Sequence, residues 1–96
     1  MMEIRETETY SHWFDRLRNR QAKARILARI RLLSLGNPGQ VKPVGEGVSE
    51  MKIDCGPGYR IYYQQRGETL AILLAAGDKR TQKRDIEKAK ELAREL

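Results

Sequence analysis

The chain has 96 residues, a third of them charged, and a formal net charge of +6. A chain of this length buries only about 60% of its unfolded surface, so it builds one core and we expect a single domain over residues 1–96. No stretch approaches the roughly 20 apolar residues of a membrane span, and the N-terminus lacks the pattern of a secretion signal, so we expect a cytoplasmic protein with no membrane partner.

The chain has one cysteine and one histidine, which limits the chemistry that it can support. Cys55 has no second cysteine with which to form an internal disulfide, and His12 alone beside it does not make a set of metal ligands. We therefore expect no metal or other cofactor. Cys55 is assigned a packing role, and His12 a structural or exposed one.

The first half of the chain predicts one strand and two helices. Residues 3–8 fit a short strand. The apolar positions that follow recur with helical spacing in two stripes, and Thr9 or Ser11 is available to cap the first helix. Gly36 suits the position just after the second helix, and Pro38 forbids its continuation, so two antiparallel helices are expected. The stripes are Tyr10, Trp13, Phe14 and Leu17, and then Ala22, Ile26, Leu27, Ile30 and Leu33.

The second half predicts three strands and a final helix. The runs at residues 48–55, 59–65 and 70–76 read as strands joined by two tight loops. The last run is apolar on both faces, which is typical of a central strand. A helical stripe then runs from Ile86 to Leu96, with Asp78 or Thr81 as its cap. The order is β-α-α-β-β-β-α, an α+β fold with an antiparallel meander, an N-terminal helical hairpin and a C-terminal helix.

Alternation along the first two of these strands suggests their register. If Gly56, Pro57 and Gly58 alone form the loop, the apolar faces match, because Ile53 then lies opposite Ile61. The same register brings two polar pairs together on the other face. We therefore expect a three-residue loop with the pairs Cys55–Tyr59, Ile53–Ile61, Met51–Tyr63, Asp54–Arg60 and Lys52–Tyr62.

The positive charge is concentrated between residues 15 and 35, where seven basic residues stand against one acidic residue, while the remainder of the chain is neutral on balance. Such a segment suits RNA, DNA or an acidic protein partner. The alternative is an ordinary solvated helix face. The candidate surface consists of Arg16, Arg18, Lys23, Arg25, Arg29 and Arg31.

The run from Glu50 to Tyr63, with Gly-Pro-Gly-Tyr-Arg-Ile-Tyr at its centre, resembles the central hairpin of the addiction-module killer proteins, a HigB-like branch of the RelE/ParE toxin superfamily. The resemblance extends to Trp13, to residues 36–39 and to residues 77–86, where Gly-Asp-Lys is followed three residues later by Gln82. It implies a RelE-like fold and a toxin of a type II toxin-antitoxin system. The implied partners are a cognate antitoxin, expected to be a helix-turn-helix protein encoded by an adjacent gene, and the ribosome with its mRNA.

The resemblance leaves the target open. RelE-like members cut mRNA in the ribosomal A site, which makes the expected activity that of a metal-independent endoribonuclease that arrests translation. ParE-like members inhibit DNA gyrase instead, and a superfamily does not fix function. A third alternative is a nucleic-acid or protein binding module without toxicity.

Metal-free cleavage of RNA proceeds by attack of a ribose 2′-hydroxyl on the adjacent phosphate, so the site needs a base, an acid and cations. By resemblance the expected catalytic set is Arg60, Lys79, Arg80 and Lys52, of which Arg60 suits a phosphate grip best. The expected substrate-binding set is Asp54, Tyr62, Gln82 and Asp85. The structural alternatives are an Asp54–Arg60 pair, solvated loop charges at 79 and 80, a core tyrosine at 62, and helix capping or compensation of the helix dipole by Asp85.

Overall fold

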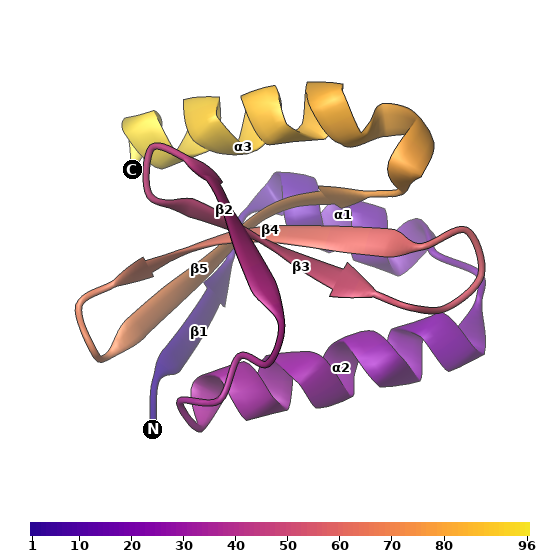
Figure 1. Cartoon of the computed structure of the whole chain (residues 1–96), viewed down its shortest axis with the longest axis horizontal. Helices are drawn as coiled ribbons and strands as arrows, with labels where there is room; N and C mark the ends of the chain where they lie inside the picture. The colour runs from indigo at the N-terminus through magenta and orange to yellow at the C-terminus, as the bar shows by residue number, and fades with distance from the viewer.

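The computed structural model describes residues 1–96 as one five-stranded sheet with three α-helices (Figure 1). The spatial order of the strands is β1-β5-β4-β3-β2. The sheet is mixed rather than purely antiparallel, because β1 runs parallel to β5. In chain order the elements are β1 (Glu3–Glu6), α1 (Glu8–Arg16), α2 (Arg20–Ser34), β2 (Val41–Gly45), β3 (Val48–Ile53), β4 (Tyr59–Arg66), β5 (Leu70–Gly77), the 3₁₀ turn η1 (Lys79–Thr81) and α3 (Gln82–Glu95).

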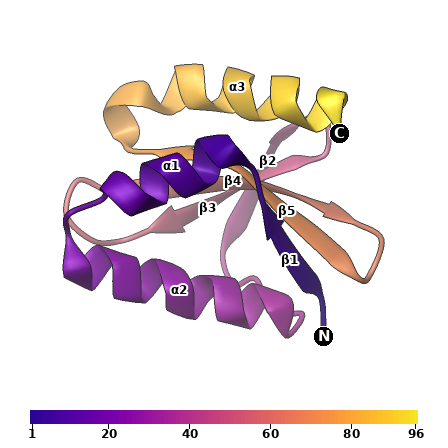
Figure 2. The ribbon, with the colours of Figure 1, turned by 180° about the vertical axis from the view of Figure 1, so that it is seen from behind.

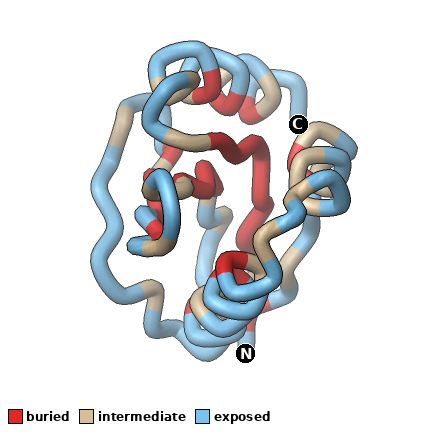
Figure 3. Tube along the Cα trace, turned by 90° about the vertical axis from the view of Figure 1, so that its right-hand side faces the viewer, coloured by how far each residue is buried: buried red, intermediate tan, exposed pale blue.

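The helices cover both faces of the sheet. α1 and α2 are joined by a short connection and run in roughly opposite directions, as the expected hairpin requires (Figure 2). Their apolar stripes pack with Met51, Ile53, Ile61 and Tyr63 in one buried cluster. α3 covers the opposite face, and β5 is buried between the two layers along most of its length (Figure 3). The prediction that residues 70–76 form a central strand is confirmed. None of the three helices has the length and apolar character needed to span a membrane.

Local signals set the helix ends. The first helix is capped by Thr7, whose hydroxyl accepts from the Tyr10 amide, and not by Thr9 or Ser11 as expected. Helix α2 is capped by Asn19. At its other end Gly36 has φ +85°, and the amides of Gly36 and Asn37 donate to Leu33 and Leu32, the paired bonds of a glycine C-cap. The predicted end of this helix is confirmed.

Strand β2 was not expected, because no strand was predicted between the second helix and residue 48. It pairs with β3 on one side only and carries Pro43, which an edge strand tolerates because it needs fewer ladder donors. The turn that follows contains Glu46 at φ 54°, and its carboxylate pairs with Arg94 of α3 at 2.6 Å. The far end of α3 is thereby tied to the β2–β3 hairpin.

The register of the β3–β4 hairpin differs from the expected one by two residues. Ile53 lies opposite Tyr59 and Lys52 lies opposite Arg60, so five residues form the loop. The reason is a tight turn inside that loop. The Gly58 amide donates to the Cys55 carbonyl, and Gly56 at φ +58° allows the chain to reverse there. Because the register is shifted by two residues, every side chain stays on its predicted face of the sheet. The predicted pairs Asp54–Arg60 and Lys52–Tyr62 do not form, because Lys52 lies opposite Arg60 and Glu50 lies opposite Tyr62.

Candidate functional site

A cleft of about 400 Å³ lies beside the β3–β4 loop. Three of the four cations expected from the sequence reach it: Lys52 from β3, Arg60 from β4, and Lys79 just beyond β5. The rest of its lining is Asp54, Cys55, Gly56, Pro57 and Gly58. Asp54 faces Lys52 at 3.6 Å and not Arg60. The cleft is therefore a polar, cation-lined site without a deep apolar pocket.

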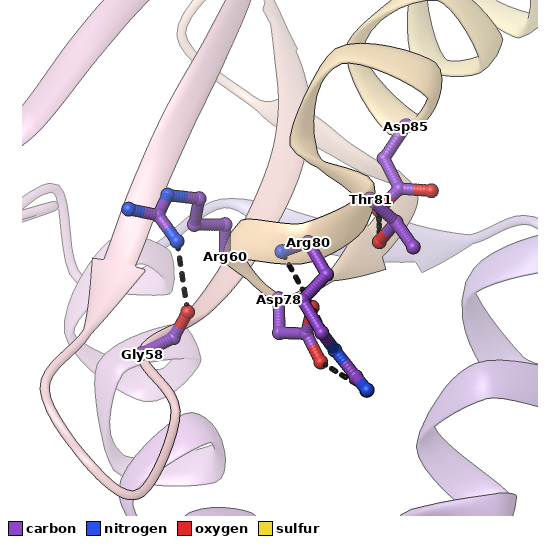
Figure 4. Close-up of polar contacts among 6 residues, drawn as sticks. All are labelled: Gly58, Arg60, Asp78, Arg80, Thr81 and Asp85. Carbon is purple, nitrogen blue, oxygen red and sulfur yellow. Dashed lines mark hydrogen bonds and ion pairs between the residues drawn. The ribbon is translucent and has the colours of Figure 1, made fainter.

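Arg60 is held firmly in this cleft, being only 8% exposed. Its Nη1 donates to the Gly58 carbonyl at 2.9 Å, so the loop glycine orients the guanidinium (Figure 4). Its Nε lies 3.8 Å from a carboxylate oxygen of Glu50 and makes no hydrogen bond. The carboxylate offsets part of the free-energy cost of burying the guanidinium charge. The result is a preorganised guanidinium at the wall of the cleft.

Glu50 is the residue of this site that sequence reasoning missed. It is 6% exposed, and its second oxygen accepts a hydrogen bond from the Gln82 side chain at 2.8 Å. Gln82 is the first residue of α3, so the start of that helix closes over Glu50 and Arg60. The available signal was weak: Glu50 alternates with the apolar residues of β3 and reads as an outward polar residue unless α3 is known to cover it. Gln82, expected to contact substrate, instead binds Glu50.

Tyr62, which was expected to contact substrate, is fully buried and matches the alternative of a core tyrosine. It lies opposite Glu50 on the face that α3 covers. Its hydroxyl has no hydrogen-bond partner. Burial, with the nearby carboxylates of Glu50 and Asp85, raises its pKa well above the usual range for tyrosine. Tyr62 therefore supports the site from within the core.

Arg80 does not line the cleft, contrary to the expectation that it works beside Lys79. Its guanidinium pairs with Asp78 at 3.0 Å, and its amide donates to the same carboxylate at 2.8 Å. Figure 4 shows the guanidinium groups of Arg60 and Arg80 directed away from each other. The hydrogen bonds from Arg80 hold the pKa of Asp78 below its ordinary value. This pair caps the turn between β5 and α3, and Arg80 lines a separate depression on α3.

Asp85 has a structural setting in place of the expected substrate contact. The Thr81 hydroxyl donates to one carboxylate oxygen of Asp85 at 2.5 Å. The other carboxylate oxygen of Asp85 lies 3.9 Å from Nε of Arg84. Lys79 makes no ion pair with Asp85. Burial raises the pKa of Asp85. The Asp85 carboxylate lies directly against the backbone at Gly77. Only glycine fits there, because a Cβ at position 77 would overlap that carboxylate. Asp85 lies in the first turn of α3, where a negative charge also suits the helix dipole.

The basic segment divides into two groups. Arg25 donates to the Asp54 carbonyl at 2.9 Å, and Arg29 donates to the carbonyls of Lys52, Pro38 and Gln40, so both tie α2 to neighbouring backbone. Lys23 lies 4.9 Å above the Phe14 ring. The expected free surface therefore shrinks to the exposed residues Arg16, Arg18 and Arg31.

The two remaining residues of interest lie in different places: Cys55 lines the cation cleft, and His12 does not. His12 is exposed and lines a depression on α1, and Cys55 is a half-buried free cysteine that packs against the core. No three side chains of histidine, cysteine, aspartate or glutamate come close enough together to hold a metal ion.

Comparison with known proteins places this chain in a family. The profile described as "Phage derived protein Gp49-like (DUF891)" matches residues 12–96. The chain belongs to the Gp49-like family. The family is one of RelE/HigB-like addiction-module toxins, which agrees with the resemblance carried by the hairpin at the level of the family and leaves the branch undetermined.

An uncharacterized protein of Haemophilus influenzae is 47% identical to this Gp49-like chain over 95 residues, which cover 99% of the chain and 96% of the relative. No solved structure matches the chain. The match to the family therefore rests on sequence, and it spans every residue that lines the cleft.

Proposed function

We propose that this Gp49-like protein is the toxin of a type II toxin-antitoxin pair and that it cuts mRNA on the ribosome without a metal ion. The observation that carries the proposal is the convergence of Lys52, Arg60 and Lys79 on one cleft. A phosphodiester that is attacked by its neighbouring 2′-hydroxyl gains negative charge in the transition state. A cation that is already held in place, as Arg60 is, stabilises that charge more strongly than water does because it needs no reorganisation.

The proposed roles follow from how far each cation is fixed. Arg60 is locked by Gly58 and Glu50, so it suits a rigid grip on the scissile phosphate. Lys79 is exposed at the mouth of the cleft and, in its charged form, would protonate the departing 5′ oxygen. Lys52 lies directly opposite Arg60 and, as the third cation of the cleft, would contact an oxygen of the same phosphate.

The exposed outer face of α2 is the surface that we assign to the antitoxin. Leu27, Leu32 and Leu35 are 56%, 41% and 52% exposed, and Arg31 lies among them. An apolar strip with a basic rim suits an amphipathic segment that carries acidic residues. Leu32→Glu should release the tagged protein from the antitoxin encoded by the neighbouring reading frame, and unchanged co-purification would contradict this assignment.

The test of the nuclease is a translation reaction with purified protein, in which primer extension maps cuts on a defined mRNA. Wild-type protein should produce cuts, and Lys79→Ala should lower cleavage by at least tenfold without loss of folding, because Lys79 is exposed. Lys88→Ala is the matched control, since Lys88 is an exposed lysine of α3 outside the cleft. Intact mRNA with wild-type protein would reject the nuclease, and inhibition of supercoiling under the same conditions would favour gyrase as the target.

A further inference from the structure

Two partly exposed aromatic side chains stand next to the cleft. Trp13 of α1 and Tyr59 of β4 have ring centroids 5.8 Å apart in an edge-to-face arrangement. The Arg60 side chain points to the opposite face of the sheet, but the Tyr59 ring lies against Gly56, which lines the cleft. The other three tyrosines, Tyr10, Tyr62 and Tyr63, are buried. The aromatic pair is therefore a partly exposed π surface that reaches the loop of the cleft through Gly56.

Trp13 also forms the wall of a second depression, of about 320 Å³, with His12, Arg16 and Leu17. The His12 and Arg16 side chains are exposed, and neither makes a hydrogen bond or ion pair with another residue. Unpaired donors beside an indole ring can bind the edge of a base or a phosphate oxygen. Packing against the core accounts for the buried sides of Trp13 and Tyr59. It does not account for His12 and Arg16, whose unpaired side chains lie beside the exposed side of Trp13.

We propose that the depression between Trp13 and Arg16 binds an unpaired nucleobase of single-stranded RNA, next to the nucleotide whose phosphate occupies the cation cleft. This inference rests on the proposed function, because it extends the same substrate along the surface. Aromatic side chains beside cations are the usual arrangement of single-strand binders, in which one stacked base contributes about 1–3 kcal/mol. The exposed Arg18 adds positive charge nearby and favours RNA over an uncharged peptide.

The chain supplies its own probe, since Trp13 is its one tryptophan. Titration of the full-length protein with a short oligoribonucleotide should quench its fluorescence. An oligomer with the same phosphates but abasic sugars should bind about tenfold more weakly and quench little, which corresponds to roughly 1.4 kcal/mol. Equal affinity and equal quenching for the two oligomers would overturn the inference, because phosphate contacts alone would then explain binding.

Substitution of Trp13 separates a base contact from a packing role. Trp13→Leu keeps an apolar side chain but removes the π face, so the preference for bases over abasic sugars should disappear, whereas Trp13→Phe should retain part of it. Binding of labelled RNA is followed by anisotropy, and thermal unfolding confirms that each variant folds. A preference that persists in a folded Trp13→Leu protein would reject the site, as would equal quenching by an acidic peptide that RNA cannot displace.

The outcomes also distinguish this inference from the proposed function. If wild-type protein cuts mRNA but does not discriminate between the two oligomers, the nuclease stands and the base site fails. If it discriminates through Trp13 but leaves mRNA intact in the translation reaction, the base site stands and the nuclease fails.

Discussion

Glu50 and Arg60 form a buried ion pair across neighbouring strands, with a carboxylate oxygen 3.8 Å from Nε and both side chains less than a tenth exposed. The Gly58 carbonyl fixes one end of the guanidinium, and Gln82 fixes the other carboxylate oxygen. This pair joins the hairpin, the cleft and the start of α3. Its energetics therefore link the stability of the fold to the orientation of Arg60.

Glu50→Ala should lower the free energy of unfolding by about 3 kcal/mol, because it leaves a buried guanidinium without its counter-charge. Urea denaturation measures the change. The double variant Glu50→Leu/Arg60→Met removes both charges and should recover most of that loss. The single variants Glu50→Leu and Arg60→Met are measured separately. If their losses of unfolding free energy simply add in the double variant, the two side chains do not interact. For tests of activity Arg60→Lys is preferable to Arg60→Ala, since alanine would leave Glu50 unpaired.

The contrast between Arg29 and Arg31 tests whether the basic segment is structural. Arg29→Ala removes hydrogen bonds to three carbonyls of β3 and the loop after α2, and should cost about 2 kcal/mol of unfolding free energy. Arg31→Ala, two residues further along α2 and exposed, should change stability by less than about 0.5 kcal/mol. Equal effects in thermal or urea unfolding would contradict the division of the segment.

Gly77→Ala should destabilise the protein by about 2–3 kcal/mol, because the added methyl group overlaps the carboxylate of Asp85. The second substitution Asp85→Ala removes the closer of the two overlaps and frees the Thr81 hydroxyl, which also lies too close to the added methyl group, to rotate away, so it should recover part of the stability. Gly67→Ala is the control: nothing lies near Gly67, so only its φ of +65° makes alanine unfavourable, at about 1 kcal/mol. A Gly77→Ala variant no worse than this control would exclude the overlap.

The raised pKa of Asp85 gives stability a defined dependence on pH. In the window from the ordinary aspartate pKa of about 3.9 up to the raised value, the folded protein binds more protons than the unfolded chain. The contribution of Asp85 to stability is therefore greatest below that window and decreases as the pH rises through it. Asp85→Asn keeps an acceptor for Thr81 and should flatten this decrease. Urea midpoints of both proteins across the acid range measure it, and parallel curves would contradict the assignment.

The helices and three central strands could be predicted because their burial patterns are local. Leu70 to Ala76 are apolar on both faces, and α2 ends at Gly36 as its glycine indicates. β2 could not be predicted, since an edge strand with Pro43 lacks the alternation of a half-buried strand. The β3–β4 register failed for a different reason: a slip of two residues preserves both faces, so alternation cannot distinguish the alternatives.

Part of the candidate site was open to sequence reasoning. Lys52, Arg60 and Lys79 were predicted from the hairpin and the end of the last strand, and the structure gathers them in one cleft. Glu50 and the burial of Tyr62 could not be predicted, because both depend on where α3 crosses the sheet. Contacts between residues more than thirty positions apart leave no periodic signal in the chain.

The parallel pairing of β1 with β5 has a consequence for the synthesis of the chain. Glu3 and Leu70 are register partners, and the hydroxyl of Thr7 donates to the carbonyl of Leu74, 67 residues later. The first strand therefore has no neighbour in the sheet until β5 has left the ribosomal exit tunnel, and Gln82 reaches Glu50 later still. Contacts between residues so far apart in the chain make folding slower than that of a helical protein of the same size. A nascent chain that ends before Gln82 therefore lacks the contact that holds Glu50 beside Arg60, so the wall of the cleft is complete only after Gln82 has been synthesised.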